Sequence, residues 1–269
     1  MRQMTLLVTG GAGFIGSNLI RLMTRAYPFH KIVSLDNYFT GKTENHLKHK
    51  NVTYLKGDTR DIAKIWEKEK LEAPVAIFHM GEYARIPQSF EDFDTCWDFN
   101  IDGTKEVIKF SPEKKAKLVY ARSSSKFGNK GEDENLSPYS WMKAKNVELL
   151  KNYSKWFGLE YVVTYFYNVY GHGQIKTGRF STVIGIFEDQ YERGEPLTVV
   201  KPGTQKRDFT YIDDIIEGIL VCYEKGHGDG YELGFGKARK IVDVARMFKT
   251  EIKMIPERKG ERVEGEADY

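Results

Sequence analysis

Short apolar runs alternate with longer amphipathic stretches along the first two-thirds of the chain. The apolar runs have the length of buried strands, and the stretches between them have the spacing of helices. We predict strands at residues 5–9, 31–35, 52–55, 75–79, 118–121 and 161–165, and helices at residues 14–27, 61–70, 92–110 and 139–157. Strands and helices that alternate in this way indicate βαβ units, hence a doubly wound parallel sheet with helices on both faces. Such sheets bind ligands at the carboxyl ends of their strands.

The pattern changes after Gly171. Residues 171–269 are richer in glycine and charge, with one further strand predicted at residues 197–200 and one helix at residues 211–224. We therefore expect an α/β domain over residues 1–170. Residues 171–269 are expected to form mainly a smaller region over the carboxyl edge of the sheet, with segments that return to the first domain.

Composition and charge narrow the classes of function. The 41 Lys and Arg residues nearly balance the 38 Asp and Glu residues, and a net charge of +3 does not predict a surface for nucleic acid. The two cysteines, Cys96 and Cys222, exclude a disulfide scaffold and a four-cysteine zinc site and fit the reducing cytoplasm. Residues 5–20 are uncharged, but glycines interrupt them and they are too short to span a membrane. We expect a cytoplasmic protein without a membrane segment or a bound metal.

The strongest local signal is the run Thr-Gly-Gly-Ala-Gly-Phe-Ile-Gly at residues 9–16, which follows a predicted strand and opens a helix. Glycines there let the chain turn tightly and bring backbone N–H groups against a pyrophosphate. The second strand leads into Asp36, 20 positions after Gly16, where a carboxylate accepts hydrogen bonds from ribose hydroxyls and repels a 2′-phosphate. A plain tight turn is the alternative for the glycines alone. Together these features predict a dinucleotide site that takes NAD in preference to NADP.

Further motifs lie in one order along the chain. They are Gly-Asp-Thr-Arg-Asp at 57–61, Phe-His-Met-Gly at 78–81, Asn-Ile-Asp-Gly-Thr at 100–104, Ser-Ser-Ser-Lys-Phe-Gly at 123–128, Ser-Pro-Tyr at 137–139 followed by Lys143, Tyr-Asn-Val-Tyr-Gly at 167–171, and Arg-Asp-Phe-Thr-Tyr-Ile-Asp-Asp at 207–214. With the glycine run, they resemble the extended short-chain dehydrogenase/reductases, and among these the nucleotide-sugar epimerases and dehydratases. The resemblance implies a Rossmann domain that binds NAD and a smaller region that binds a nucleotide-diphosphate sugar, with a UDP-sugar expected.

The resemblance also assigns roles by position. The cofactor-binding residues that it implies are Gly10, Gly13, Phe14, Ile15, Gly16, Asp36, Asn37, Asp58, Thr59, Met80, Gly81, Glu82, Ala84, Asn100, Tyr139, Lys143 and Tyr167. The substrate-binding residues that it implies are Arg85, Ser124, Asn168, Arg207 and Arg258. Arginine suits a diphosphate because its planar guanidinium binds two phosphate oxygens at once.

The catalytic residues are expected to be Ser123, Tyr139 and Lys143. Tyr139 and Lys143 are four positions apart and share one face of a helix. Free tyrosine, with a pKa of about 10, is a poor base at neutral pH, but an ammonium group beside it stabilises the phenolate. The family pattern selects Ser123 as the hydroxyl that bonds the reacting sugar oxygen, and an error of one position would select Ser124 instead.

The chain departs from the family pattern at three places. Glu82 stands where the family usually has a small residue, and the sequence offers no physical account of a carboxylate near the cofactor. Tyr165 stands where arginine is common. Relatives also continue beyond the last residues, so the substrate-binding region is expected to be shortened at its C-terminal end. A smaller lid, a covering dimer partner and a shortened chain are the alternatives.

The expected reaction is inversion at C4 of a UDP-hexose through a transient 4-keto sugar. Dehydratases of the family carry Asp-Glu directly after the catalytic threonine, whereas Ser124 and Ser125 occupy those positions here. A 4,6-dehydratase or another NAD-dependent sugar-modifying enzyme is the first alternative, and a catalytically idle protein that binds NAD or a nucleotide sugar is the second. The resemblance further implies a homodimer joined by a four-helix bundle of residues 92–110 and 139–157, with apolar contacts from Trp97, Phe99, Trp141 and Trp156.

Overall fold

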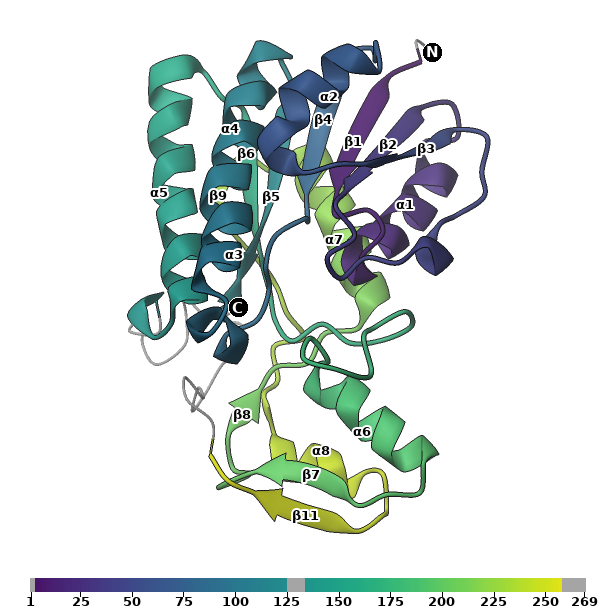
Figure 1. Ribbon diagram of the computed structural model, residues 1–269, viewed down its shortest axis with the longest axis vertical. Helices are drawn as coiled ribbons and strands as arrows, with labels where there is room; N and C mark the ends of the chain where they lie inside the picture. Colours follow the sequence, from purple (N-terminus) through teal and green to yellow (C-terminus); the bar gives the residue numbers. More distant parts are fainter. Residues whose placement is uncertain (1–2, 125–133, 258–269) are drawn as a thin grey trace.

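A seven-stranded sheet forms the centre of the molecule in the computed structural model, which describes residues 3–124 and 134–257. Its strands run in the order β3-β2-β1-β4-β5-β6-β9, and every neighbouring pair is parallel (Figure 1). The strands are β1 (Thr5–Thr9), β2 (Lys31–Asp36), β3 (Val52–Lys56), β4 (Pro74–His79), β5 (Lys117–Ser123), β6 (Tyr161–Phe166) and β9 (Gly228–Leu233). The predicted doubly wound parallel sheet is confirmed.

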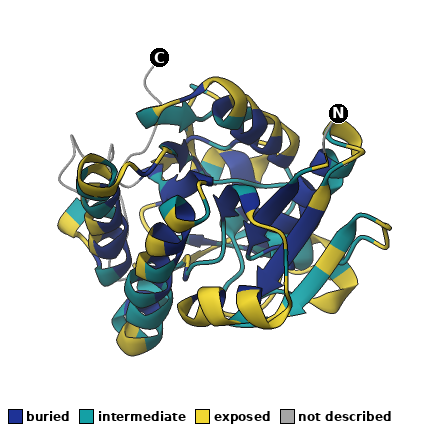
Figure 2. Ribbon diagram, turned by 90° about the horizontal axis from the view of Figure 1, so that it is seen from above, coloured by how far each residue is buried: buried dark blue, intermediate teal, exposed yellow. Residues whose placement is uncertain are grey.

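Helices cover both faces of this sheet, because successive strand side chains point to opposite sides. In β1, Leu6 and Val8 pack toward α1 (Phe14–Ala26) and α7 (Ile212–Lys225). Leu7 packs into the opposite core, with α2 (Ile62–Lys68), α4 (Thr104–Glu113) and α5 (Pro138–Phe157). Figure 2 shows the buried strands between helices whose outer turns are exposed. The hydrophobic pattern of the strands thus accounts for the three-layered arrangement.

A smaller region lies beyond the carboxyl ends of the strands (Figure 1). In it, β7 (Leu197–Val200) pairs in parallel with β11 (Ile252–Ile255), and β8 (Lys206–Arg207) pairs antiparallel to β10 (Arg239–Lys240). The helices α6 (Val183–Glu192) and α8 (Ile241–Arg246) close a separate apolar core with β7. The chain then returns to the large sheet, since α7 packs on one face and β9 adds the last strand beside β6.

The sequence pattern misses two features of the large sheet and its helices. The strand β9, Gly-Asp-Gly-Tyr-Glu-Leu, lacks an apolar run and was not predicted. The stretch 92–110 is not one helix: α3 (Phe93–Trp97) leads into the π-helical turn η4 (Asp98–Gly103) before α4 begins. Single 3-10 turns occur at η1 (Thr43–Asn45), η2 (Thr59–Asp61) and η3 (Pro87–Phe90). Among the described residues, no helix combines the length and hydropathy needed to cross a bilayer.

Candidate active site

A cavity of about 520 Å³ opens where the carboxyl ends of the strands meet the smaller region. This volume is within the range of roughly 300–1,000 Å³ that small-molecule sites occupy. One wall comes from the loops after β1, β4 and β5 and from the start of α5; the other comes from α6, β7 and β8. The site lies at the place that the doubly wound topology predicts.

The glycine run after β1 forms one end of the cavity. Gly10 has a left-handed φ of +69°, and a Cβ atom there would lie 2.6 Å from the Cα of Gly81, in the loop after β4. A Cβ atom on Gly16 would lie 2.2 Å from the carbonyl oxygen of Gly10. Gly13 is the N-cap of α1, so the first backbone N–H groups of that helix are available to a ligand. Only glycines permit this backbone cradle, which fits a pyrophosphate.

Asp36, at the end of β2, lines the same end of the cavity. Its carboxylate accepts hydrogen bonds from the backbone N–H of Ala12 at 2.9 Å and of Tyr38 at 2.7 Å. Burial raises the pKa of Asp36 above its usual range, and the two N–H donors oppose that shift. The two bonds fix the carboxylate beside the glycine loop, where its acceptor capacity suits ribose hydroxyls. Cradle and carboxylate together fit an NAD cofactor.

Tyr139 and Lys143 lie in the first two turns of α5. Ser137 is the N-cap of this helix and accepts a hydrogen bond from the backbone N–H of Ser140, while Pro138 occupies the first turn. Both side chains line the cavity and are nearly buried, and no described residue bonds the Tyr139 hydroxyl. Ser123 at the end of β5 and the neighbouring Ser124 line the cavity as well. The structure therefore brings the predicted catalytic residues to one cavity.

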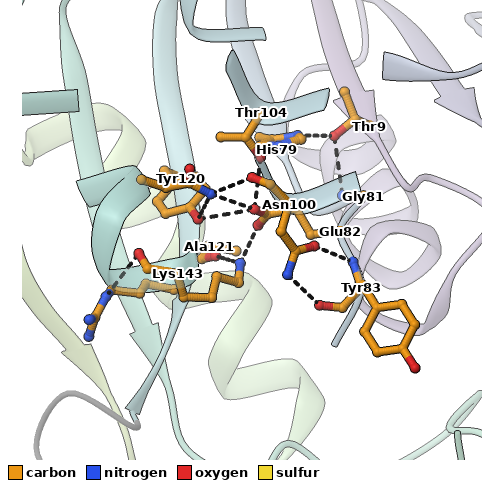
Figure 3. Close-up of polar contacts among 12 residues, drawn as sticks. Thr9, His79, Gly81, Glu82, Tyr83, Asn100, Thr104, Tyr120, Ala121 and Lys143 are labelled. Carbon is orange, nitrogen blue, oxygen red and sulfur yellow. Dashed lines mark hydrogen bonds and ion pairs between the residues drawn. The ribbon is translucent and has the colours of Figure 1, made fainter. Parts of the chain in front are cut away.

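Glu82, for which the sequence alone offers no physical account, lies beside Lys143 in the structure (Figure 3). Its carboxylate forms an ion pair with the Lys143 ammonium group, which also donates to the carbonyl oxygen of Ala121 at 2.5 Å. Only 3% of the Glu82 side chain and 5% of the Lys143 side chain are exposed. A carboxylate near the cofactor site is thus paired directly with the predicted catalytic lysine.

The substrate-binding residues suggested by the resemblance lie toward the smaller region. Arg85 lines the cavity and donates to the carbonyl oxygens of Ala84 and Phe180, so it ties the loop after β4 to the smaller region. Burial lowers the pKa of Arg85 to about 10, which leaves its guanidinium charged at neutral pH. Asn168 and Arg207 also line the cavity, and the Asn168 side chain donates to the Asp208 carbonyl at 2.8 Å.

Three of the predicted cofactor residues do not line the cavity. Asn100, in η4, is fully buried and holds both the N–H and the carbonyl of Tyr83, at 2.7 and 3.0 Å. The hydroxyl of the fully buried Tyr167 contacts the carboxylate of Glu232. Asp58 caps η2 and pairs with Arg60. Arg258 lies outside the described residues.

An aromatic cluster beside the cavity was missed by sequence reasoning. The ring of Phe180, from the smaller region, packs at 5.3 Å from Phe39 and 5.4 Å from Tyr83, and Phe39 packs at 5.1 Å from Phe99. Phe39, Tyr83, Phe99 and Phe180 all line the cavity. These residues lie far apart in the sequence in segments without a recognisable motif, so only the fold brings them together.

Comparison with known proteins identifies the family. Residues 6–234 match the model of the NAD dependent epimerase/dehydratase family. The chain belongs to this family. The cofactor predicted from the sequence, NAD, is confirmed at the level of the family. Among curated relatives, an uncharacterised UDP-glucose epimerase of Bacillus subtilis is 32% identical, covering 91% of this chain and 81% of the relative. A UDP-N-acetyl-alpha-D-glucosaminuronate decarboxylase of Bacillus cytotoxicus is 29% identical, covering 89% and 78%.

Solved structures of family members share the fold across the whole chain. The UDP-glucose 4-epimerase of Thermotoga maritima, solved with UDP-glucose, aligns with a TM-score of 0.91 and 25% identity, covering 99% of this chain and 90% of that one. The UDP-glucose 4-epimerase of Thermus thermophilus, solved with NAD, aligns with a TM-score of 0.88 and 26% identity, covering 98% and 90%. The family and its NAD-dependent chemistry on nucleotide sugars follow, whereas identities near 30% leave the reaction open among epimerases, dehydratases and decarboxylases.

Proposed function

We propose that this family member is an NAD-dependent 4-epimerase of a UDP-hexose. The observation that carries the proposal is the carboxylate content of the cavity. Among the described residues that line it, only Asp36 and Glu82 are acidic. Asp36 is held at the glycine loop, and Glu82 is paired with Lys143. A 4,6-dehydratase must eliminate water across C5 and C6, which needs a base for the C5 proton. The hydroxyl of Ser124 is a poor substitute for a carboxylate in this role, so the cavity favours epimerisation over dehydration.

Epimerisation needs only the groups that this site provides. Bound NAD supplies the hydride acceptor and, in the reverse direction, the hydride donor for C4. Tyr139 as phenolate removes the proton of the 4-hydroxyl and later returns it to the 4-oxygen. Lys143 stabilises the phenolate by its charge, and Ser123 donates a hydrogen bond to the same sugar oxygen. Between the two transfers the keto sugar must turn over, so that its other face receives the hydride.

Turnover on a panel of nucleotide sugars separates this proposal from the idle-protein alternative. The protein, supplied with NAD⁺, is incubated with UDP-, GDP- and dTDP-sugars, and the products are separated by chromatography. We expect conversion of a UDP-hexose. A protein that binds NAD but converts no member of the panel would contradict an enzymatic function. A 4-keto-6-deoxy product would instead indicate a dehydratase, and a decarboxylated product would indicate a decarboxylase, the two other reactions found among the relatives.

Arg207 is proposed to bind the diphosphate of the substrate. It is nearly buried in β8 and lines the cavity. We expect Arg207→Met to weaken UDP binding, measured by calorimetry, by roughly tenfold to a hundredfold, because a hydrogen bond to a charged group contributes about 1.5–3 kcal/mol. Arg239, which lies opposite Arg207 in β10 and is exposed, provides the control. Equal losses in Arg207→Met and Arg239→Met would argue against a specific role.

We further propose a homodimer formed by α3, η4, α4 and α5. Of the aromatic residues expected at the interface, Trp141 and Trp156 are 38% and 64% exposed, whereas Trp97 and Phe99 pack partly inside. Phe93, at the start of α3, is 46% exposed. Exposed apolar groups of this size on adjacent helices are typical of an interface.

The thiols of Cys96 and Cys222 are buried and form no disulfide, which supports the cytoplasmic location expected from the sequence.

Light scattering tests the dimer directly. At micromolar concentration we expect a mass of two 31.1 kDa chains. Trp141→Glu should give the mass of one chain, because an unpaired charge would be buried at the interface. Phe29→Glu, at a site 63% exposed in the loop after α1, the helix that covers the other face of the sheet from α5, should leave the dimer intact. A wild-type monomer under these conditions would overturn the proposal.

A further inference from the structure

The Glu82 carboxylate is buried among donors from three elements. Its Oε1 accepts hydrogen bonds from the Thr104 hydroxyl of α4 at 2.8 Å, the Tyr120 hydroxyl of β5 at 3.0 Å and the Asn146 amide of α5 at 3.2 Å. Its Oε2 accepts a hydrogen bond from the Lys143 ammonium group. A buried carboxylate is costly unless it is paired and hydrogen-bonded, and both conditions are met here. The site is therefore built to hold an ionised Glu82.

A chain of hydrogen bonds connects this carboxylate to the glycine loop. Burial lowers the pKa of His79 to about 4, so its imidazole is neutral at pH 7. Thr104 uses its hydroxyl hydrogen on Glu82, so it must accept from His79 Nε2, at 2.9 Å. His79 Nδ1 then accepts from the Thr9 hydroxyl at 2.6 Å, and Thr9 accepts from the Gly81 N–H at 3.2 Å. Each donor of this chain is therefore directed along it toward Glu82, and Figure 3 shows the contacts that form the chain.

We propose that Glu82 is a positioning residue for Lys143, which fixes the ammonium group at the cavity wall and offsets its positive charge next to Tyr139. The proposal rests on the proposed function, in which Tyr139 is the base and Lys143 stabilises its phenolate. It gives a physical role to the residue at which this chain departs from the family pattern.

Lys143 has a second anchor that does not depend on Glu82. The carbonyl oxygen of Ala121 accepts from its ammonium group, which also lies 4.8 Å from the ring centre of Tyr120. Two of the three ammonium hydrogens are thus used by Glu82 and Ala121, and no described residue accepts the third. If the Glu82 charge is removed while an acceptor oxygen stays, Lys143 is expected to remain in place.

The sign of the effect follows from the charges. A phenolate at Tyr139 is stabilised by the Lys143 charge and destabilised by the Glu82 charge. The other titratable groups around this pair are His79 of β4, Cys96 of α3 and Tyr120 of β5, with the cations Arg85 and Arg122 near Tyr139 and Tyr120. Burial raises the pKa of Cys96 and of Tyr120, so both stay neutral at pH 7. Asp92 also acts on Cys96, but Glu82 is the carboxylate that is paired with Lys143.

The test compares wild type with Glu82→Gln, which keeps the shape and removes the charge. Formation of tyrosinate is followed by near-ultraviolet absorbance against pH, and the signal lost in Tyr139→Phe identifies the residue. We expect Tyr139 to ionise at a pH lower by about one unit in Glu82→Gln, a typical size for removing one nearby charge. The acid limb of the pH profile of kcat/KM on the converted UDP-sugar should shift equally. An unchanged or higher pH of ionisation would overturn the proposal.

Two further comparisons keep the result interpretable. Asp92→Asn neutralises another carboxylate nearby, which binds the Tyr83 hydroxyl and Arg179 but not Lys143, and should leave both curves unchanged. If Glu82→Gln does not fold, Glu82→Asp and Glu82→Asn form a second matched pair, and only the neutral member should show the shift. The absorbance titration needs no substrate, so a protein that converts no sugar but shows the shift would refute the proposed function and leave the role of Glu82 standing.

Discussion

Tyr139→Phe is expected to bind NAD as the wild type does and to lose about 10²–10⁴-fold in turnover. Tyr139 lines the cavity and stands one helical turn before Lys143 on α5, so its phenol is the group to which we assign the proton transfer. Phenylalanine keeps the ring that packs with Met142 and Tyr83, so folding should be preserved. Turnover is measured on the converted UDP-sugar, and NAD binding by calorimetry.

The matched control for this variant is Tyr153→Phe. Tyr153 lies on the same helix, α5. It packs against the apolar core that α5 shares with α2 and α4, and it does not line the described cavity. Its loss of one hydroxyl should leave turnover within about twofold, because surface and peripheral changes are usually small. Turnover in Tyr139→Phe equal to that of the control would refute the base assigned here.

Gly10→Ala is expected to abolish measurable NAD binding, a loss of more than about a hundredfold, or roughly 3 kcal/mol. The added Cβ would meet backbone atoms of Gly81 at 2.6 Å, and neither backbone segment can yield without moving β1 or β4. The φ of +69° adds strain of about 1–2 kcal/mol for a residue with a side chain. The affinity is measured by calorimetry, alongside the free energy of unfolding.

Gly194→Ala separates the two causes. Gly194 has the same φ of +69°, but nothing lies within 4 Å of the added Cβ. This variant should show the strain alone, as a lower free energy of unfolding, with NAD affinity unchanged. If Gly10→Ala bound NAD as tightly as Gly194→Ala does, the close approach of the two loops would not be what forms the cofactor cradle.

The strands that could be predicted are those whose own residues are apolar. Each of the first six contains a run of mostly apolar residues, and all but the edge strand β3 are largely buried between the helices on the two faces of the sheet. The strand β9 is stabilised instead by residues distant in the sequence. It pairs with β6, and the Tyr165 hydroxyl donates a hydrogen bond to Asp229 at 2.5 Å. Tyr165 is fully buried, and it contacts β9 and does not line the described cavity. Such pairing leaves no trace in the local pattern.

Much of the site could be predicted because its motifs are local. The glycine loop and Asp36 belong to one strand–helix–strand unit of β1, α1 and β2, and Tyr139 and Lys143 belong to one helix, α5. The partner of Lys143 could not be predicted, because Glu82 reaches it only through the adjacency of β4, β5 and α5. The π-helical turn that lets Asn100 hold Tyr83 has no sequence signature either.

The measurement that tests the central claim most directly is product analysis by NMR. The enzyme and NAD⁺ are incubated with UDP-glucose and, separately, with UDP-N-acetylglucosamine, and the sugar proton signals are followed to equilibrium. The account predicts interconversion at C4, with one of the two substrates giving its galacto isomer and no net oxidation. A stable 4-keto-6-deoxy sugar without interconversion at C4 would contradict it.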